Sequence, residues 1–175
     1  DTSRWQTYND LSFECETPAG TQWFIHRKGG CVRFDKKTWM HYGIEDGLMD
    51  QVNTILSTRE GEVWAAGSHQ NVAAAARFDG NRWSLKTHPK LAARIRQRSV
   101  FESADGALWF GSGGINQGKE SVGGLLRYGP KDATSTAREW THFRPLETSV
   151  PKFAYGFGQT PDGTIWVGGR SFHRF

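Results

Sequence analysis

A four-residue motif of the form Gly-x-x-Trp recurs four times along the chain. The copies lie at residues 20–23, 61–64, 106–109 and 163–166. Each copy is followed by an Arg-aromatic pair: Arg33-Phe34, Arg77-Phe78, Arg127-Tyr128 and Arg174-Phe175. Three of these pairs are followed in turn by a second tryptophan, at Trp39, Trp83 and Trp140. Motifs that recur in a fixed order every 40–50 residues or so indicate a repeat architecture.

The missing copy of the second tryptophan is found at the other end of the chain. Reading residues 174–175 directly into residues 1–5 gives R-F-D-T-S-R-W, which matches R-F-D-G-N-R-W at residues 77–83 in the same frame. All eight tryptophans then belong to the repeat, two per copy. They are Trp5, Trp23, Trp39, Trp64, Trp83, Trp109, Trp140 and Trp166. We therefore interpret these residues as structural, filling the spaces between sheets.

Each repeat predicts four antiparallel strands, with tight turns such as Asp79-Gly80 between them. Repeats of this length with four strands are typical of β-propeller blades. We predict an all-β, four-bladed propeller in one domain, residues 1–175, with blades at about 11–42, 50–86, 98–144, and 152–175 together with 1–8. Pairing of the two chain ends would remove the unpaired sheet edge beside Phe175. A larger ring, of which this chain is a part, is the alternative.

Composition agrees with an all-β protein, because the chain has 21 glycines and 13% aromatic residues. No apolar run approaches the roughly 20 residues of a membrane helix. Cys15 and Cys31 are predicted on the first and third strands of one blade, about 9–10 Å apart. A disulfide needs a shorter separation, so we expect two free, buried thiols. A cytoplasmic location is therefore not excluded.

The stretch around the second repeat resembles the two-component-regulator propeller repeat. The matching residues are Trp39, Tyr42, Asp46, Gly47, Leu48, Val52, Ile55, Gly61, Trp64 and the run at 77–80. The resemblance extends over the whole chain in weaker form, and it implies a binding fold. Such repeats usually occur in periplasmic sensor halves of bacterial receptors, which implies a periplasmic or extracellular location. A weaker resemblance is to streptogramin-lyase-type propellers, but their cluster of histidines and a glutamate has no counterpart at matching positions here.

The candidate binding residues lie in the connections that a propeller places on one face. Residues 80–101 contain six Lys and Arg residues and no Asp or Glu, whereas the whole chain has a net charge of +4. Leu91 and Ile95 are spaced as on a short amphipathic helix at 89–98. We predict a basic rim there and further binding residues in the turns between second and third strands. The eight candidates are Lys90, Arg94, Arg96, Arg98, Arg27, Lys28, His69 and Arg170.

A basic rim favours an acidic protein partner or an anionic surface, including peripheral contact with a membrane. Nucleic acid is disfavoured because the aromatic residues are assigned to the blades. The alternative interpretation of the charges is an ordinary solvated surface. The histidines share no metal-ligand spacing, and no cofactor motif or catalytic triad is present. The sequence thus predicts a non-catalytic binding or scaffolding propeller, such as an accessory subunit of a bacterial assembly. A ligand- or carbohydrate-sensing domain is the alternative, and a lyase-type enzyme is third.

Overall fold

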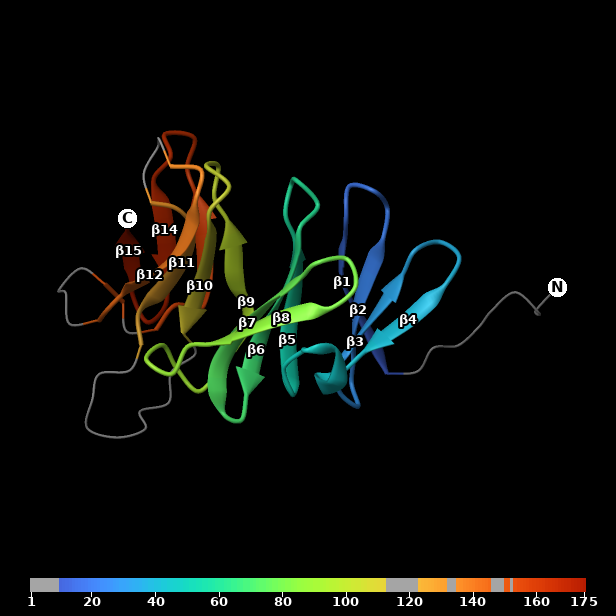
Figure 1. Ribbon diagram of the computed structural model, residues 1–175. Helices are drawn as coiled ribbons and strands as arrows, with labels where there is room; N and C mark the ends of the chain where they lie inside the picture. Colours follow the sequence, from blue (N-terminus) through green and yellow to red (C-terminus); the bar gives the residue numbers. More distant parts are fainter. Residues whose placement is uncertain (1–9, 113–122, 132–134, 146–149, 152) are drawn as a thin grey trace.

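The computed structural model describes residues 10–112, 123–131, 135–145, 150–151 and 153–175, which form four antiparallel sheets (Figure 1). The first sheet consists of β1 (Leu11–Glu16), β2 (Gln22–His26), β3 (Cys31–Phe34) and β4 (Trp39–Tyr42). The second consists of β5 (Gln51–Ser57), β6 (Val63–His69), β7 (Val72–Phe78) and β8 (Trp83–Thr87). The third consists of β9 (Ile95–Glu102), β10 (Leu108–Ser112), β11 (Leu125–Pro130) and β12 (Arg138–Phe143). The fourth consists of β13 (Gly156–Gln159), β14 (Ile165–Gly168) and β15 (Phe172–Arg174).

Every sheet is a meander in which consecutive strands pair, so the all-β prediction is confirmed. The first strands of neighbouring sheets, β1, β5, β9 and β13, contact one another in that order. These four strands therefore form the inner edge of the array, and the last strand of each sheet lies on the outside. Figure 1 shows the sheets standing side by side like blades.

The sequence repeat corresponds to a repeated strand register. The first tryptophan of each sheet lies opposite the arginine of the Arg-aromatic pair, in all four sheets. In the first three sheets, the aromatic residue of that pair lies opposite the second tryptophan, as Phe78 does with Trp83. The glycine that opens the motif has a left-handed φ of +76° to +89° in every copy. This conformation favours glycine over residues with a Cβ, which explains its recurrence.

Apolar side chains fill the three spaces between consecutive sheets. The cluster between the first two sheets includes Trp23, Tyr42 and Trp83. The next cluster includes Trp64 and Phe110, and the third includes Trp109 and Val167. Burial of large aromatic side chains is a major source of stability in such a layered arrangement.

The two end sheets leave tryptophans exposed. Trp39 in the first sheet is 38% exposed and Trp166 in the fourth is 40% exposed, whereas Trp23, Trp64, Trp83 and Trp109 are at most 5% exposed. The first and fourth sheets lie at opposite ends of the row in Figure 1. Trp5 and the strand predicted at residues 1–8 fall outside the described residues. Closure of the ring and its blade count are therefore not confirmed.

The short helix predicted at residues 89–98 is wrong. Leu91 and Ile95 are buried, as expected for the apolar side of this segment, but they pack between the second and third sheets. Ile95 begins β9 and lies opposite Ser112 of β10. The register of this pair is irregular, and Arg98 beside it has a φ of +65°. Backbone pairing with β10 thus prevails over the helical spacing of two apolar residues.

Candidate functional site

The four predicted rim residues are divided between a connection and an inner strand. Lys90 and Arg94 lie in the connection from β8 to β9, and Arg96 and Arg98 lie on β9 itself. All four are exposed. None of them forms an ion pair with a carboxylate within the described part of the chain. The guanidinium of Arg96 lies 5.3 Å from the ring centre of Tyr155, which offers a cation–π contact but no charge neutralisation.

A cavity of about 440 Å³ lies between the inner strands β5 and β9. It is lined by Asn53, Arg94, Arg96 and Gln97. The side-chain amide of Asn53 donates a hydrogen bond of 2.7 Å to the backbone carbonyl of Ile95, which ties the two inner strands together. The cavity is therefore polar, basic and located at the inner edge of the sheets.

The remaining predicted residues lie in the turns between second and third strands, apart from this cavity. Arg27 and Lys28 are exposed in the β2–β3 turn, where the Lys28 ammonium lies 3.9 Å from the Asp10 carboxylate. His69 ends β6, and its Nδ1 is buried without a hydrogen-bond partner among the described residues. Arg170, between β14 and β15, lies with its guanidinium 5.5 Å from the ring of Phe153. Of the eight candidates, only Arg94 and Arg96 line the inner cavity.

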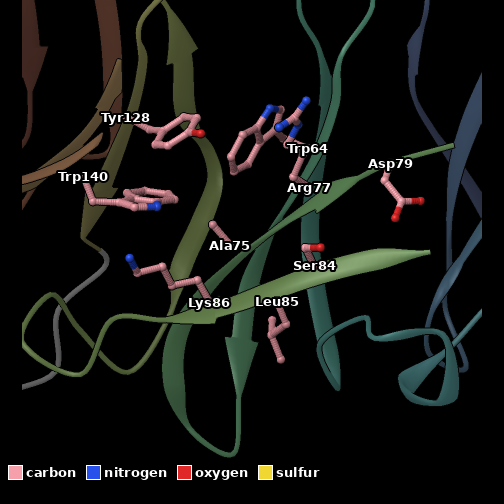
Figure 2. A pocket seen from close by; sticks show the side chains of 9 residues that line it. All are labelled: Trp64, Ala75, Arg77, Asp79, Ser84, Leu85, Lys86, Tyr128 and Trp140. Atoms are coloured by element: carbon pink, nitrogen blue, oxygen red, sulfur yellow. The ribbon is translucent and has the colours of Figure 1, made fainter. Parts of the chain in front are cut away.

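A second cavity, of about 460 Å³, lies between the second and third sheets, and Figure 2 shows it from close by. We call it the interblade pocket. Its lining residues come from both sheets: Trp64, Ala75, Arg77, Asp79, Ser84, Leu85, Lys86, Tyr128 and Trp140. The rings of Trp64 and Tyr128 are 5.0 Å apart, and those of Tyr128 and Trp140 are 4.9 Å apart. Three aromatic rings thus form one side of the pocket, as Figure 2 shows.

Charged side chains surround these rings. The Lys86 ammonium lies 5.7 Å from the ring centre of Trp140 and has no ion pair among the described residues. The Glu62 carboxylate lies 2.9 Å from the guanidinium of Arg77 and 3.5 Å from that of Arg138. It also accepts a hydrogen bond of 3.3 Å from the indole N–H of Trp64. One carboxylate therefore faces two guanidiniums, and this side of the pocket keeps an excess of positive charge.

His88 lies behind Trp140, with ring centres 4.4 Å apart. Burial lowers the pKa of His88 to about 4, and the positive charges of Lys86 and His142 act in the same direction. Its Nε2 is buried and has no hydrogen-bond partner within the described residues. His88 is thus neutral at pH 7.

The interblade pocket is not predicted from the sequence, although its signal is visible in the repeat. Three residues after the outer-strand tryptophan, the first and third sheets carry the aromatic residues Tyr42 and Phe143, whereas the second carries Lys86. Among these three sheets, only the second has a cation in place of the aromatic residue, and the pocket lies beside this lysine.

The described residues contain no group of three or more His, Cys, Asp or Glu side chains able to hold a metal ion. Cys15 and Cys31 are free and lie on β1 and β3, the strands predicted for them. Burial raises the pKa of Cys15 to about 11 and raises that of Cys31 as well, so both thiols are protonated and weakly nucleophilic at pH 7. No helix in the described ranges is long and apolar enough to span a membrane.

Comparison with known proteins gives likenesses in structure and none in sequence. No protein-family model and no curated protein matches the chain. PorZ, an essential surface component of the type-IX secretion system of Porphyromonas gingivalis, is similar over 94% of this chain and 25% of its own, at 12% identity and a TM-score of 0.59. A virginiamycin B lyase from Staphylococcus aureus is similar over 98% of this chain and 57% of its own, at 17% identity and a TM-score of 0.59.

A third solved structure, the extracellular domain of the hybrid two-component system protein BT4673 from B. thetaiotaomicron, covers 98% of this chain at 12% identity, with a TM-score of 0.43. The chain spans about a quarter of PorZ and somewhat more than half of the lyase. At these identities the likenesses bear on the fold alone. Taken with the repeated strand register, the likenesses to PorZ and to the lyase show that this chain has a β-propeller-type fold.

Proposed function

We propose that the chain is a non-catalytic binding module that docks an acidic protein surface through the arginines at the inner edge of its third sheet. The observation that carries this proposal is the group Arg94, Arg96 and Arg98. These three exposed side chains lie within five residues of one another and have no carboxylate partner in the described part of the chain.

Unpaired arginines suit such a role for two physical reasons. A guanidinium presents planar N–H donors that bind a carboxylate in a bidentate geometry. Like charges gathered at one place also create a field that steers an acidic partner toward it and accelerates association. The cavity between β5 and β9 gives a partner side chain access to Arg94 and Arg96.

The proposed setting is an accessory subunit of a bacterial assembly in the periplasm or outside the cell. The similarity to PorZ, a surface component of a secretion system, supports this setting. An anionic surface, including a membrane, is the competing occupant, and the salt and probe comparisons below separate the two. Nucleic acid is disfavoured, because most of the described tryptophans are packed between sheets rather than available for base stacking.

The test uses a variant with Arg94→Ser, Arg96→Ser and Arg98→Ser and a fluorescent polyglutamate peptide as the probe. We expect at least a tenfold loss of affinity in this variant and a weaker parent affinity as salt rises, because exposed charges are screened over about 8 Å at physiological ionic strength. The matched control carries Lys37→Ser, Arg82→Ser and Lys131→Ser, which remove the same charge from the turns between third and fourth strands. Equal losses in both variants would contradict a specific site. Stronger binding of the parent to vesicles containing anionic lipid than to the peptide would favour the membrane.

We further propose that the propeller has four blades and is closed by residues 1–8. In the first two interfaces, the first tryptophan of one sheet contacts an aromatic residue and the outer-strand tryptophan of the next sheet, as Trp23 does with Phe78 and Trp83. In the third, Trp109 contacts Phe175 at 5.4 Å, and Trp5 would supply the outer-strand ring. The first and fourth sheets lie at opposite ends of the row in Figure 1, so closure requires the exposed Trp39 and Trp166 to come together in a fourth interface.

Closure predicts that Trp5→Ala lowers the free energy of unfolding by about 3 kcal/mol, as expected for a buried aromatic residue. Chemical denaturation of the parent and the variant measures this difference. A change below about 0.5 kcal/mol, typical of a surface substitution, would contradict closure by the N-terminal segment.

A further inference from the structure

The interblade pocket occupies a position that is filled by an aromatic side chain in the two neighbouring interfaces. Between the first two sheets, Tyr42 lies 5.8 Å from Trp23 and 5.2 Å from Phe78, measured between ring centres. At the end of the third sheet, Phe143 lies 5.7 Å from Trp109 and 4.8 Å from Phe175. In both cases a ring from the outer strand completes the packing around the first tryptophan of its own sheet.

The second sheet has Lys86, which carries no ring, at this position. The ammonium lies over Trp140. Figure 2 shows Lys86 pointing toward Trp140, while Trp64, Tyr128 and Ala75 border the space beside it. The cavity of about 460 Å³ is within the range of small-molecule sites in proteins. The pocket therefore has aromatic walls like those around Tyr42 and Phe143, but its own outer strand contributes no ring at this position.

The charges around the cavity favour an anionic group near Lys86. Glu62 is engaged by Arg77 and Arg138, so it does not neutralise Lys86. The Asp79 carboxylate accepts hydrogen bonds from the backbone N–H groups of Asn81 and Arg82 in its own turn. Figure 2 shows Asp79 at the far side of the pocket from Lys86.

We propose that the interblade pocket binds an aromatic carboxylate. The aromatic ring of the ligand takes the place held by Tyr42 and Phe143 in the other interfaces, and its carboxylate pairs with the Lys86 ammonium. Tyr128 lines the pocket, and its hydroxyl can bond a polar substituent of the ligand. The site is distinct from the arginines at the inner edge, because the two cavities share no lining residue.

A sugar fits this pocket less well. Pyranose rings stack on a single open aromatic face, whereas the three rings of this pocket lie 4.9 to 6.0 Å from one another, measured between ring centres. Trp140 is contacted by His88 at 4.4 Å and by the Lys86 ammonium at 5.7 Å. The pocket thus favours a flat ring inserted among other rings, in the offset or edge-to-face geometries that aromatic side chains adopt.

The experiment titrates the parent protein with 4-hydroxyphenylacetate and follows tryptophan fluorescence and calorimetric heat. We expect saturable binding with a Kd below 1 mM. The neutral amide of the same compound should bind at least tenfold more weakly, because it lacks the charge that pairs with Lys86. A short peptide ending in tyrosine carries the same ring and carboxylate, so its affinity relative to the free acid identifies the source of the ligand.

Two substitutions separate the roles of charge and space. Lys86→Met removes the ammonium and should weaken binding of the acid at least tenfold. Lys86→Tyr restores the aromatic residue of the neighbouring interfaces, fills the site, and should abolish binding while the protein stays folded. Lys37→Met, at an exposed turn of the first sheet, is the matched control and should bind as the parent does.

Three results would overturn the proposal. The first is no saturable binding of the acid or the peptide up to 10 mM, and the second is unchanged binding by the folded Lys86→Tyr variant. The third is tighter binding of glucuronate than of the aromatic acid, which would assign the pocket to an acidic sugar instead. None of these results bears on the arginines of the third sheet, which the polyglutamate experiment tests separately.

Discussion

The first two interfaces between sheets are built from the same repeat and differ at one outer-strand position. The first has the Tyr42 ring there, and we call it the filled interface, whereas the second has Lys86, and we call it the open interface. Between the first and second sheets, Trp23 and Trp83 pack with ring centres 5.4 Å apart, and both are at most 4% exposed. Between the second and third sheets, the equivalent residues Trp64 and Trp140 lie 6.0 Å apart, and Trp140 is only partly buried. We attribute the difference to the position that is Tyr42 in the first interface and Lys86 in the second.

The two interfaces differ in whether their buried indole N–H groups have hydrogen-bond partners. The filled interface leaves the indole N–H groups of Trp23 and Trp83 buried and without a hydrogen-bond partner among the described residues. In the open interface the indole N–H of Trp64 is bonded to Glu62. A filled interface thus contributes stability through apolar packing, whereas the open one retains polar groups that a ligand can contact.

The largest expected effect is that of Trp83→Ala, and Trp140→Ala is the matching substitution in the open interface. Truncation of Trp83 leaves a cavity in a filled interface and should lower the free energy of unfolding by about 4 kcal/mol. Truncation of Trp140 enlarges a cavity that already exists, and about 2 kcal/mol is expected because part of this side chain is exposed. Urea denaturation of both variants measures the difference. Equal losses would show that the two interfaces are equally packed.

The second prediction converts the filled interface into the open type. Tyr42→Lys removes a ring that is 3% exposed and puts an ammonium beside Trp23 and Phe78. We expect a loss of about 3 kcal/mol, somewhat less than for Trp83→Ala, because the lysine stem covers apolar surface while its charge reaches water. Tyr42→Phe keeps the ring and is the matched control, with an expected change within about 0.5 kcal/mol.

The sequence predicted the repeat, the strand order and the burial of the first tryptophan in the first three sheets, because motifs that recur in a fixed order imply a repeated strand register. The first tryptophan of the fourth sheet, Trp166, is 40% exposed. The helix predicted at residues 89–98 rested on the spacing of Leu91 and Ile95. Two apolar residues four apart occur on one face of a helix, but also in an irregular strand and the connection before it. Only pairing of Ile95 with β10 distinguishes these structures, and that contact joins residues far apart in the chain. The interblade pocket was missed for a similar reason, since Lys86 looks like any exposed lysine until its neighbours on the third sheet are known.

The third prediction concerns pH and is specific to the open interface. His88 has a pKa of about 4 in the folded protein and about 6.5 when unfolded, so the unfolded chain binds more protons between these values. The contribution of His88 to stability should be constant above pH 7 and fall as the pH drops from 6.5 toward 4, by roughly 2–3 kcal/mol in total. His88→Leu should remove this part of the acid sensitivity. Parallel denaturation curves of parent and variant across this range would contradict the assignment.

The smallest expected effect is a gain in stability from Lys86→Tyr. The new ring would meet Trp64 and Tyr128 as Tyr42 meets Trp23 and Phe78, and it would bury apolar surface that now lines a cavity. A gain of about 1 kcal/mol is expected, because cavity filling adds packing but rarely reproduces an evolved interface completely. Thermal unfolding at pH 7 measures the change, and the double variant with Tyr42→Lys tests whether the two interfaces act independently. Lys86→Tyr should give the same gain in the Tyr42→Lys background as in the parent if the two interfaces are energetically separate. Equal gains would show that Lys86 lowers the stability of the second interface alone.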